Sequence, residues 1–242
     1  MVAEPTSYGD EKEVAGMFDK IAQRYDLLNG IISLGIDRYW RRAAVKSVKR
    51  ACSPRSILDL AAGTCDFSLE LASLKPEEIV AMDISPAMLA AGREKIMKRG
   101  MESIIEVVNG SAAGIPFRDN RFDVVAVAFG VRNFSDLKGS IREMLRVLRP
   151  GGLLLVLEFS EIENRMARFF FNIWFRYIVP LVGRLISGHG DAYSFLPDSV
   201  ALFPSGDQFI RSLSEAGFSD CKARRLTMGV ATIYTAHKFT TQ

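Results

Sequence analysis

The chain has few of the residue types that bind metals or form disulfides. Its 242 residues include three cysteines and two histidines. The cysteines, at positions 52, 65 and 221, are odd in number and have no C-x-x-C spacing. Because a disulfide framework or a zinc site needs cysteines in paired spacing, the sequence predicts neither, and we expect no metal site.

Charge of one sign and long apolar runs are also scarce. The 31 basic and 28 acidic residues leave a net charge of +3, which is too small to indicate nucleic-acid binding. A membrane span needs about 20 consecutive apolar residues, and a secretory signal needs a basic start followed by an apolar core. No stretch has either pattern, so we expect a cytoplasmic protein with no nucleic-acid partner.

The overall composition is that of a globular chain. Hydrophobic residues make up 48% and charged residues 24%, and a chain of this length can bury a substantial core. Between positions 56 and 158, short apolar runs alternate with segments of helical spacing. The runs predict strands over 56–60, 79–83, 104–109, 122–128 and 153–158, with helices such as 88–98 and 137–148 between them. This alternation favours a parallel sheet covered by helices on both faces.

The last part of the chain adds to that sheet. A helix ends at Gly217, and two strand-like runs follow over 220–226 and 230–238. The prediction is therefore an α/β fold with a doubly wound, mostly parallel sheet of seven strands.

The first part of the chain predicts a helical cap over 14–50. One helix face is formed by apolar residues at spacings of three and four, namely Val14, Met17, Phe18 and Ile21. Since no flexible linker interrupts the sequence, residues 1–242 are predicted to form one domain, with 161–200 as an inserted helical segment.

The inserted segment has an amphipathic pattern. Three arginines share one arc of the predicted helix over 165–178, and aromatic and aliphatic side chains occupy the rest. This pattern is typical of a helix at a membrane surface and equally of a helix buried against its own domain. Residues 165–188 are therefore a candidate for peripheral membrane contact, and both interpretations stay open.

Residues 57–66, with the sequence I-L-D-L-A-A-G-T-C-D, carry the main candidate site. The apolar run contains Asp59 and ends in small residues, and helical spacing follows, which predicts a strand, a tight turn and a helix N-terminus with free backbone N–H groups. Gly63 lets the backbone approach a ligand without a Cβ in the way. The next strand ends in Asp83, about 20 residues beyond the turn, the offset at which nucleotide-binding folds place a ribose-binding carboxylate.

The turn lacks the second and third glycines of G-x-G-x-x-G, which counts against a nicotinamide-dependent oxidoreductase. Asp-x-Ala-x-Gly-Thr followed by a strand ending in Asp instead resembles the class I S-adenosylmethionine-dependent methyltransferases, which have a Rossmann-like fold. In that class the turn takes the methionine end of the cofactor and the second acid takes the ribose hydroxyls. From the residues alone, an ordinary turn with a solvated Asp83 is the alternative.

Longer stretches resemble one family, the ubiquinone/menaquinone biosynthesis C-methyltransferases. They cover nearly the whole chain, and the F-G-x-R-N and Y-D-x-x-N motifs are the most specific. The stretches are 18–29, 33–40, 129–133, 146–152 continuing into 157–160, and 193–199. The resemblance implies transfer of a methyl group from S-adenosylmethionine to a ring carbon of a demethylquinol with a polyprenyl tail.

The resemblance also implies the site residues. The cofactor-binding residues expected from it are Asp59, Ala61, Gly63, Thr64, Asp83, Ile84, Met88, Ser111, Ala112, Ala128 and Phe129. At the acceptor, Arg132 is expected to stabilise a phenolate, and Asn133 and Tyr25 to orient the ring oxygens. From the residues alone, a salt-bridged turn at Arg132 and Asn133, and core packing of Tyr25, are the alternatives.

Four positions depart from the family pattern. The family usually has Gly where Cys65 stands, Asp where Ser111 stands, and His where Asp37 and Tyr234 stand. The acceptor therefore stays open: a methyltransferase of the same fold acting on a different lipophilic or small-molecule acceptor, and an adenosyl-binding module without catalysis, are the other candidates. The sequence gives neither the length of an isoprenoid tail nor the oligomeric state, so a homodimer stays open as well.

Overall fold

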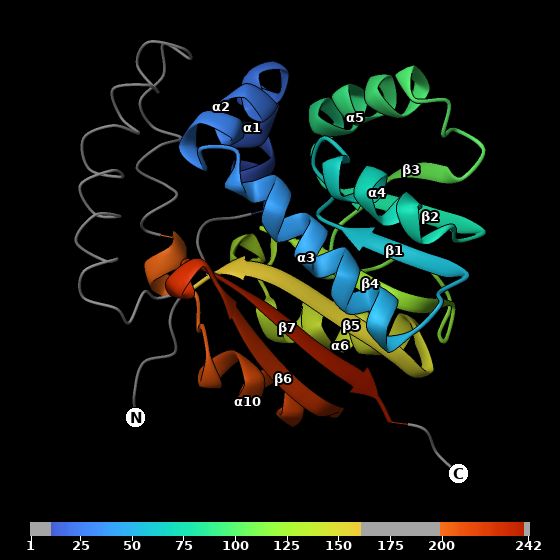
Figure 1. The fold of residues 1–242 in the computed structure, drawn as a ribbon, viewed down its shortest axis with the longest axis vertical. Helices are drawn as coiled ribbons and strands as arrows, with labels where there is room; N and C mark the ends of the chain where they lie inside the picture. The colour runs from blue at the N-terminus through green and yellow to red at the C-terminus, as the bar shows by residue number, and fades with distance from the viewer. Residues whose placement is uncertain (1–10, 161–198, 240–242) are drawn as a thin grey trace.

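The computed structural model describes residues 11–160 and 199–239, and a sheet of seven strands forms its centre (Figure 1). The strands follow the order β3-β2-β1-β4-β5-β7-β6. In this sheet β7 runs antiparallel to both of its neighbours, and the other adjacent strands are parallel. The predicted doubly wound, mostly parallel α/β sheet is therefore confirmed. The strands are β1 Ser56–Leu60, β2 Glu78–Asp83, β3 Ile105–Asn109, β4 Phe122–Ala128, β5 Leu148–Phe159, β6 Phe218–Leu226 and β7 Ala231–Lys238.

Helices precede and connect the strands. The α-helices are α1 Glu11–Ile21, α2 Tyr25–Ile32, α3 Ile36–Ala51, α4 Asp66–Leu71, α5 Pro86–Lys98, α6 Leu137–Val147 and α10 Asp207–Glu215. Short 3-10 helices lie at Ala22–Arg24, Ala72–Leu74, Val131–Asn133 and Thr227–Gly229. No helix in the described residues combines the length and the hydrophobicity that a bilayer span requires.

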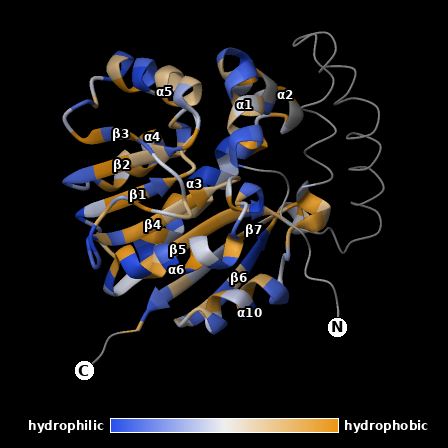
Figure 2. Ribbon diagram, turned by 180° about the vertical axis from the view of Figure 1, so that it is seen from behind, coloured by the Kyte–Doolittle hydropathy of each residue, from blue (hydrophilic) through white to orange (hydrophobic). Residues whose placement is uncertain are grey.

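Two hydrophobic cores lie on opposite faces of the sheet. All five residues of β1 are buried, and its side chains alternate between the cores. Ile57 packs in the core that α3, α4 and α5 cover, whereas Leu58 packs in the core that α6 and α10 cover. Burial on both faces is why the strands read as continuous apolar runs, and Figure 2 shows these hydrophobic strands between helices with many hydrophilic residues.

Most boundaries lie within two residues of the sequence prediction, and the cap and strand β5 differ more. The cap predicted over 14–50 consists of three α-helices, and the last begins after Leu34 and Gly35, which both have positive φ (52° and 73°). Strand β5 begins at Leu148, five residues before the predicted start at 153. The Pro-Gly-Gly sequence lies within a register shift of this strand. Phe122 of β4 pairs with Leu148, whereas Val124, two residues later, pairs with Leu153, five residues later.

The segment predicted as an inserted helical region over 161–200 lies almost entirely outside the described residues. The same holds for the membrane contact predicted for 165–188. Both stay predictions, as does the assignment of 1–242 to a single domain.

Candidate active site

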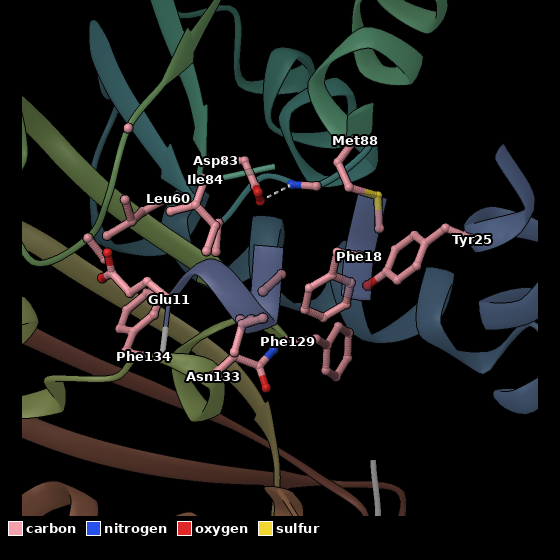
Figure 3. Close-up of a pocket in the computed structure, with 17 residues that line it drawn as sticks. Glu11, Phe18, Tyr25, Leu60, Asp83, Ile84, Met88, Phe129, Asn133 and Phe134 are labelled. Carbon is pink, nitrogen blue, oxygen red and sulfur yellow. Dashed lines mark hydrogen bonds between the residues drawn. The ribbon is translucent and has the colours of Figure 1, made fainter. Parts of the chain in front are cut away.

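An open cleft lies where the carboxyl ends of β1, β2 and β4 meet the cap helix α1 (Figure 3). It encloses about 660 Å³ of empty space, including its solvent-facing mouth. Between β1 and β4 the strand order reverses, and ligands of open α/β sheets bind at such a switch point. The lining residues are Glu11, Val14, Phe18, Tyr25, Leu60, Ala61, Gly63, Asp83, Ile84, Met88, Gly110, Ala112, Ala128, Phe129, Gly130, Asn133 and Phe134.

The turn after β1 forms one wall of the cleft with its backbone. Ala61, Gly63 and Cys65 all have positive φ, between 54° and 63°. A Cβ at Gly63 would meet no atom within 4 Å, so the absence of a side chain there leaves the wall open to a ligand. The loop after β4 packs closely on this turn, because a Cβ at Gly130 would lie 2.5 Å from the Cβ of Ala61.

Asp83 joins the tip of β2 to that turn. One carboxylate oxygen accepts a hydrogen bond from the Gly63 amide at 2.8 Å, and the other accepts one from the Ser85 amide at 2.8 Å (Figure 3 draws the first). Burial raises the pKa of this carboxyl, and the backbone N–H donors oppose that shift. Each oxygen keeps a lone pair, so the carboxylate can accept further hydrogen bonds from a ligand diol.

Asp59 lies behind the turn, not in the cleft. Its side chain is fully buried, and one oxygen accepts a hydrogen bond from the Ser68 hydroxyl at 2.5 Å. Its Oδ1 atom has no hydrogen-bond partner among the described residues. Burial, with a further contribution from the nearby Asp83, raises the pKa of Asp59 to about 7. The structure therefore places Asp59 in the core and not among the residues that line the cleft, and its expected role in cofactor binding stays a prediction.

Thr64 and Ser111 hold the helical cap instead of lining the cleft. The Thr64 hydroxyl donates to Asp26 at 2.6 Å and accepts a hydrogen bond from Lys95 at 2.8 Å. The Ser111 hydroxyl donates to the Glu11 carboxylate at 2.6 Å. The other expected cofactor-binding residues, apart from Asp59, all line the cleft.

Two polar side chains reach the cleft from distant parts of the sequence, Asn133 from the 3-10 turn after β4 and Tyr25 from the start of α2. Asn133 lines the cleft, and its buried Oδ1 atom has no hydrogen-bond partner among the described residues. The Tyr25 hydroxyl points into the cleft in Figure 3, and its ring packs edge-on against Phe18 with 6.1 Å between centroids. Burial raises the pKa of the Tyr25 hydroxyl, while a hydrogen bond with Asn29 and the charge of Arg132 oppose the shift.

Arg132 does not line the cleft. Its Nη1 atom donates to the Glu158 carboxylate at 2.8 Å and to the Phe129 carbonyl, and its Nε atom donates to the Ser199 hydroxyl at 3.2 Å. The side chains of this ion pair are 7% and 0% exposed. The structure therefore shows Arg132 in a salt-bridged turn, and its expected contact with an acceptor stays a prediction.

Sequence reasoning did not assign seven of the lining residues to the site. They are Glu11, Val14, Phe18, Leu60, Gly110, Gly130 and Phe134. Val14 and Phe18 carried a signal, because both lie on the apolar face predicted for the first helix. Glu11 carried none, since its contact with Ser111 joins residues 100 positions apart.

The other departures from the family pattern have structural roles outside the cleft. Asp37 pairs with Arg41 at 2.8 Å within α3. The Tyr234 hydroxyl accepts a hydrogen bond from the Gly206 amide at 2.7 Å, and its ring packs on Phe209. Neither Asp37 nor Tyr234 lines the cleft, so these two departures from the family pattern do not alter its lining.

The sheet order, the glycine turn after β1 and the acidic tip of β2 are those of the Rossmann-like fold of class I S-adenosylmethionine-dependent methyltransferases. Comparison with known proteins agrees. The chain belongs to the ubiE/COQ5 methyltransferase family, whose sequence model matches residues 6–238.

Two relatives illustrate the similarity. A Bacteroides fragilis protein named demethylmenaquinone methyltransferase is 42% identical over 228 residues, which are 94% of this chain and 93% of that protein. A Geotalea daltonii protein named ubiquinone/menaquinone biosynthesis C-methyltransferase UbiE is 41% identical over 229 residues, which are 94% of this chain and 97% of that protein.

Solved structures share the fold at much lower identity. The [4+2]-cyclase SpnF superposes with a TM-score of 0.70 at 17% identity and covers 98% of both chains. A SAM-dependent methyltransferase from Aquifex aeolicus gives a TM-score of 0.59 at 20% identity, over 80% of this chain and 88% of that one. Because the first of these is described as a cyclase, the fold alone does not define the reaction.

Proposed function

We propose that the protein transfers a methyl group from S-adenosylmethionine to a ring carbon of a demethylquinol that carries a polyprenyl tail. The two named relatives support this acceptor class, since each aligns with more than nine-tenths of the chain. The observation that carries the proposal is the cleft itself, which has Asp83 and the Gly63 turn for a donor and Asn133 and Tyr25 for an acceptor.

The residues of the donor side fit an adenosyl sulfonium. Asp83 would accept hydrogen bonds from the ribose hydroxyls, and the open backbone at Gly63 would receive the methionine end. Ile84 and Met88 offer apolar surface beside the Asp83 carboxylate. When bound, this cofactor supplies a methyl group already activated by the positive sulfur, so the protein needs no covalent nucleophile.

The residues of the acceptor side suit a flat phenolic ring. Phe18 and Phe129 give the cleft aromatic surface against which such a ring can pack. A ring carbon becomes nucleophilic as the neighbouring hydroxyl loses its proton. The Oδ1 of Asn133 is buried and unpartnered, and a rotation of this amide toward the cleft would let it accept a hydrogen bond from that hydroxyl and orient it. Tyr25 keeps its proton because its pKa is raised, so it can donate to a ring oxygen and stabilise developing negative charge.

Arg132 acts in this proposal as a positioning residue. It lies in the 3-10 turn that also carries Asn133, and both its backbone N–H and its guanidinium bond the buried Glu158 carboxylate. The same guanidinium bonds the carbonyl of Phe129. These contacts fix the loop after β4, and thereby hold the Asn133 amide in the cleft.

The test is an acceptor screen with purified protein. We expect methyl-donor consumption with a reduced prenylated naphthoquinol or benzoquinol, and a product heavier by one methylene group in mass spectrometry. Consumption with a different lipophilic or small acceptor alone would assign the chain to another methyltransferase of the same fold. Donor binding without consumption by any acceptor would favour the adenosyl-binding module.

A further inference from the structure

Glu11 is a carboxylate at an otherwise apolar end of the cleft. It is the first residue of α1 and lines the cleft together with Val14, Ala112 and Phe134. Its Oε1 atom accepts hydrogen bonds from the hydroxyls of Ser111 at 2.6 Å and Ser135 at 3.3 Å. Both partners are neutral, and in the described part of the chain both bonds end on the same oxygen. The second oxygen, Oε2, can therefore accept an N–H donor from a ligand.

The strand order places Glu11 along the path of the cofactor. β1, β2 and β3 are parallel neighbours, so the turn at Gly63, the tip at Asp83 and the residues after β3 follow one another along one edge of the sheet. Gly110 and Ala112, which come directly after β3, line the same cleft as Glu11. A ligand with its amino-acid end at Gly63 and its ribose at Asp83 must direct its third part, the base, to the end that holds Glu11.

We propose that Glu11 accepts a hydrogen bond from the exocyclic amine of the bound base and thereby selects adenine over purines that lack this group. The inference rests on the proposed function, because it takes S-adenosylmethionine as the ligand. A carboxylate only accepts hydrogen bonds, and an exocyclic amine only donates them, so the two groups are complementary. The hydroxyls of Ser111 and Ser135 hold the carboxylate in place. Because Glu11 is the first residue of α1, this hydrogen bond would also join the cap helix to the ligand.

Calorimetry with two ligands tests the inference. The first is S-adenosylhomocysteine, and the second is its analogue in which the purine lacks the exocyclic amine. We expect the parent protein to bind the first roughly 10- to 100-fold more tightly, the range of one charge-assisted hydrogen bond. Glu11→Ala should lose most of this preference while its affinity for the amine-free analogue stays unchanged. Glu11→Gln, which keeps an acceptor oxygen and the shape of the side chain, should keep part of it.

Glu13→Ala is the matched control, because Glu13 lies on the same helix and is exposed. It should keep the full preference of the parent. Equal weakening of both ligands by Glu11→Ala, or a preference unchanged in both Glu11 variants, would overturn the role of Glu11 and leave the proposed function intact. Failure of the parent to bind either ligand would overturn the proposed function and, with it, this inference.

Discussion

The Asp83 carboxylate accepts a hydrogen bond from the Gly63 amide at 2.8 Å, so a bond within the protein itself holds the tip of β2 and the turn after β1 together. This contact fixes the spacing between the two groups proposed to hold the ribose and the methionine end of the cofactor. Preformed sites of this kind lose little conformational entropy on binding.

Replacement of Asp83 should therefore weaken cofactor binding. We expect Asp83→Ala to reduce the binding free energy of S-adenosylmethionine by about 1.5–3 kcal/mol, because charge-assisted hydrogen bonds to the ribose are lost. The Asp83→Asn variant keeps one acceptor oxygen, so its affinity for S-adenosylmethionine should lie between those of the parent and the alanine variant. Calorimetry gives both values, and equal affinity of all three proteins would contradict the ribose assignment.

Asn133→Ala should lower turnover without changing the affinity for the methyl donor. The substitution removes the buried acceptor oxygen that is proposed to orient the phenolic hydroxyl, and we expect kcat to fall about tenfold or more. Steady-state kinetics with separate titration of the donor makes the distinction. Gln208→Ala, which removes an exposed amide on α10, is the control and should leave both quantities unchanged. A weaker donor affinity with normal kcat would move Asn133 to the cofactor side.

Arg132→Ala should destabilise the fold as well as reduce activity. The substitution leaves the buried Glu158 carboxylate without its ion-pair partner, and breaking buried pairs of this kind costs about 3–5 kcal/mol. The double variant Arg132→Met, Glu158→Gln should recover much of that stability, since it removes both charges. Urea unfolding measures the effect, and a normal stability for Arg132→Ala would show that the pair does not support the turn.

Cys65 and Gly92 should be energetically coupled. A Cβ at Gly92 would lie 2.4 Å from the Cys65 sulfur, so Gly92→Ala should destabilise the protein by about 1–3 kcal/mol. Cys65→Gly removes the sulfur and suits the positive φ of 63° at that position. In this background Gly92→Ala should cost less, because the clash with the sulfur is gone, only the tight contact with the Thr64 backbone carbon at 3.3 Å remains, and alanine favours the helix. Strictly additive effects in a double-mutant cycle would contradict this coupling.

Asp59→Asn should stabilise the protein more at pH 8 than at pH 5. The pKa of Asp59 is raised to about 7 in the folded state by burial, whereas an unfolded Asp titrates near pH 4. The folded state therefore binds a proton that the unfolded state has lost, and the stability of the parent falls as the pH rises from about 4 to about 7.

The amide that this substitution introduces does not titrate, so the advantage of the variant should grow over that interval and then level off. Calorimetric melting at the two pH values measures the difference. The exposed substitution Glu102→Gln is the control for loss of one carboxylate. An advantage for Asp59→Asn that is equal at both pH values would show that Asp59 is ionised in the folded protein throughout.

The sequence predicts those parts of the site that depend on local pattern. The strand, turn and helix over 57–66 and the acid at the end of the next strand were identified because each element is contiguous in sequence. Ten of the fourteen residues expected at the site line the cleft. The remaining four, Asp59, Thr64, Ser111 and Arg132, face buried or cap-side partners that lie far away in the sequence or on the opposite side of the turn.

Arg132 shows why such partners are difficult to predict. Its motif indicated an acceptor contact, but its partner Glu158 lies 26 residues later at the end of the strand 148–159. An acid within an apolar strand is a signal that a cation must be nearby, yet the sequence does not say which one. Ser111 is similar, since the family usually has Asp at this position, and Glu11, from the first described helix, places a carboxylate beside it.

The most direct test of the account follows the methyl group itself. Protein incubated with S-adenosylmethionine labelled with carbon-13 on the methyl group and with a reduced prenylated naphthoquinol should give one new carbon signal in the NMR spectrum, at the position of a methyl group bonded to an aromatic ring carbon. A signal of a methyl group bonded to oxygen, or unreacted donor after prolonged incubation with the protein, would contradict the claim that this cleft catalyses C-methylation of a quinol.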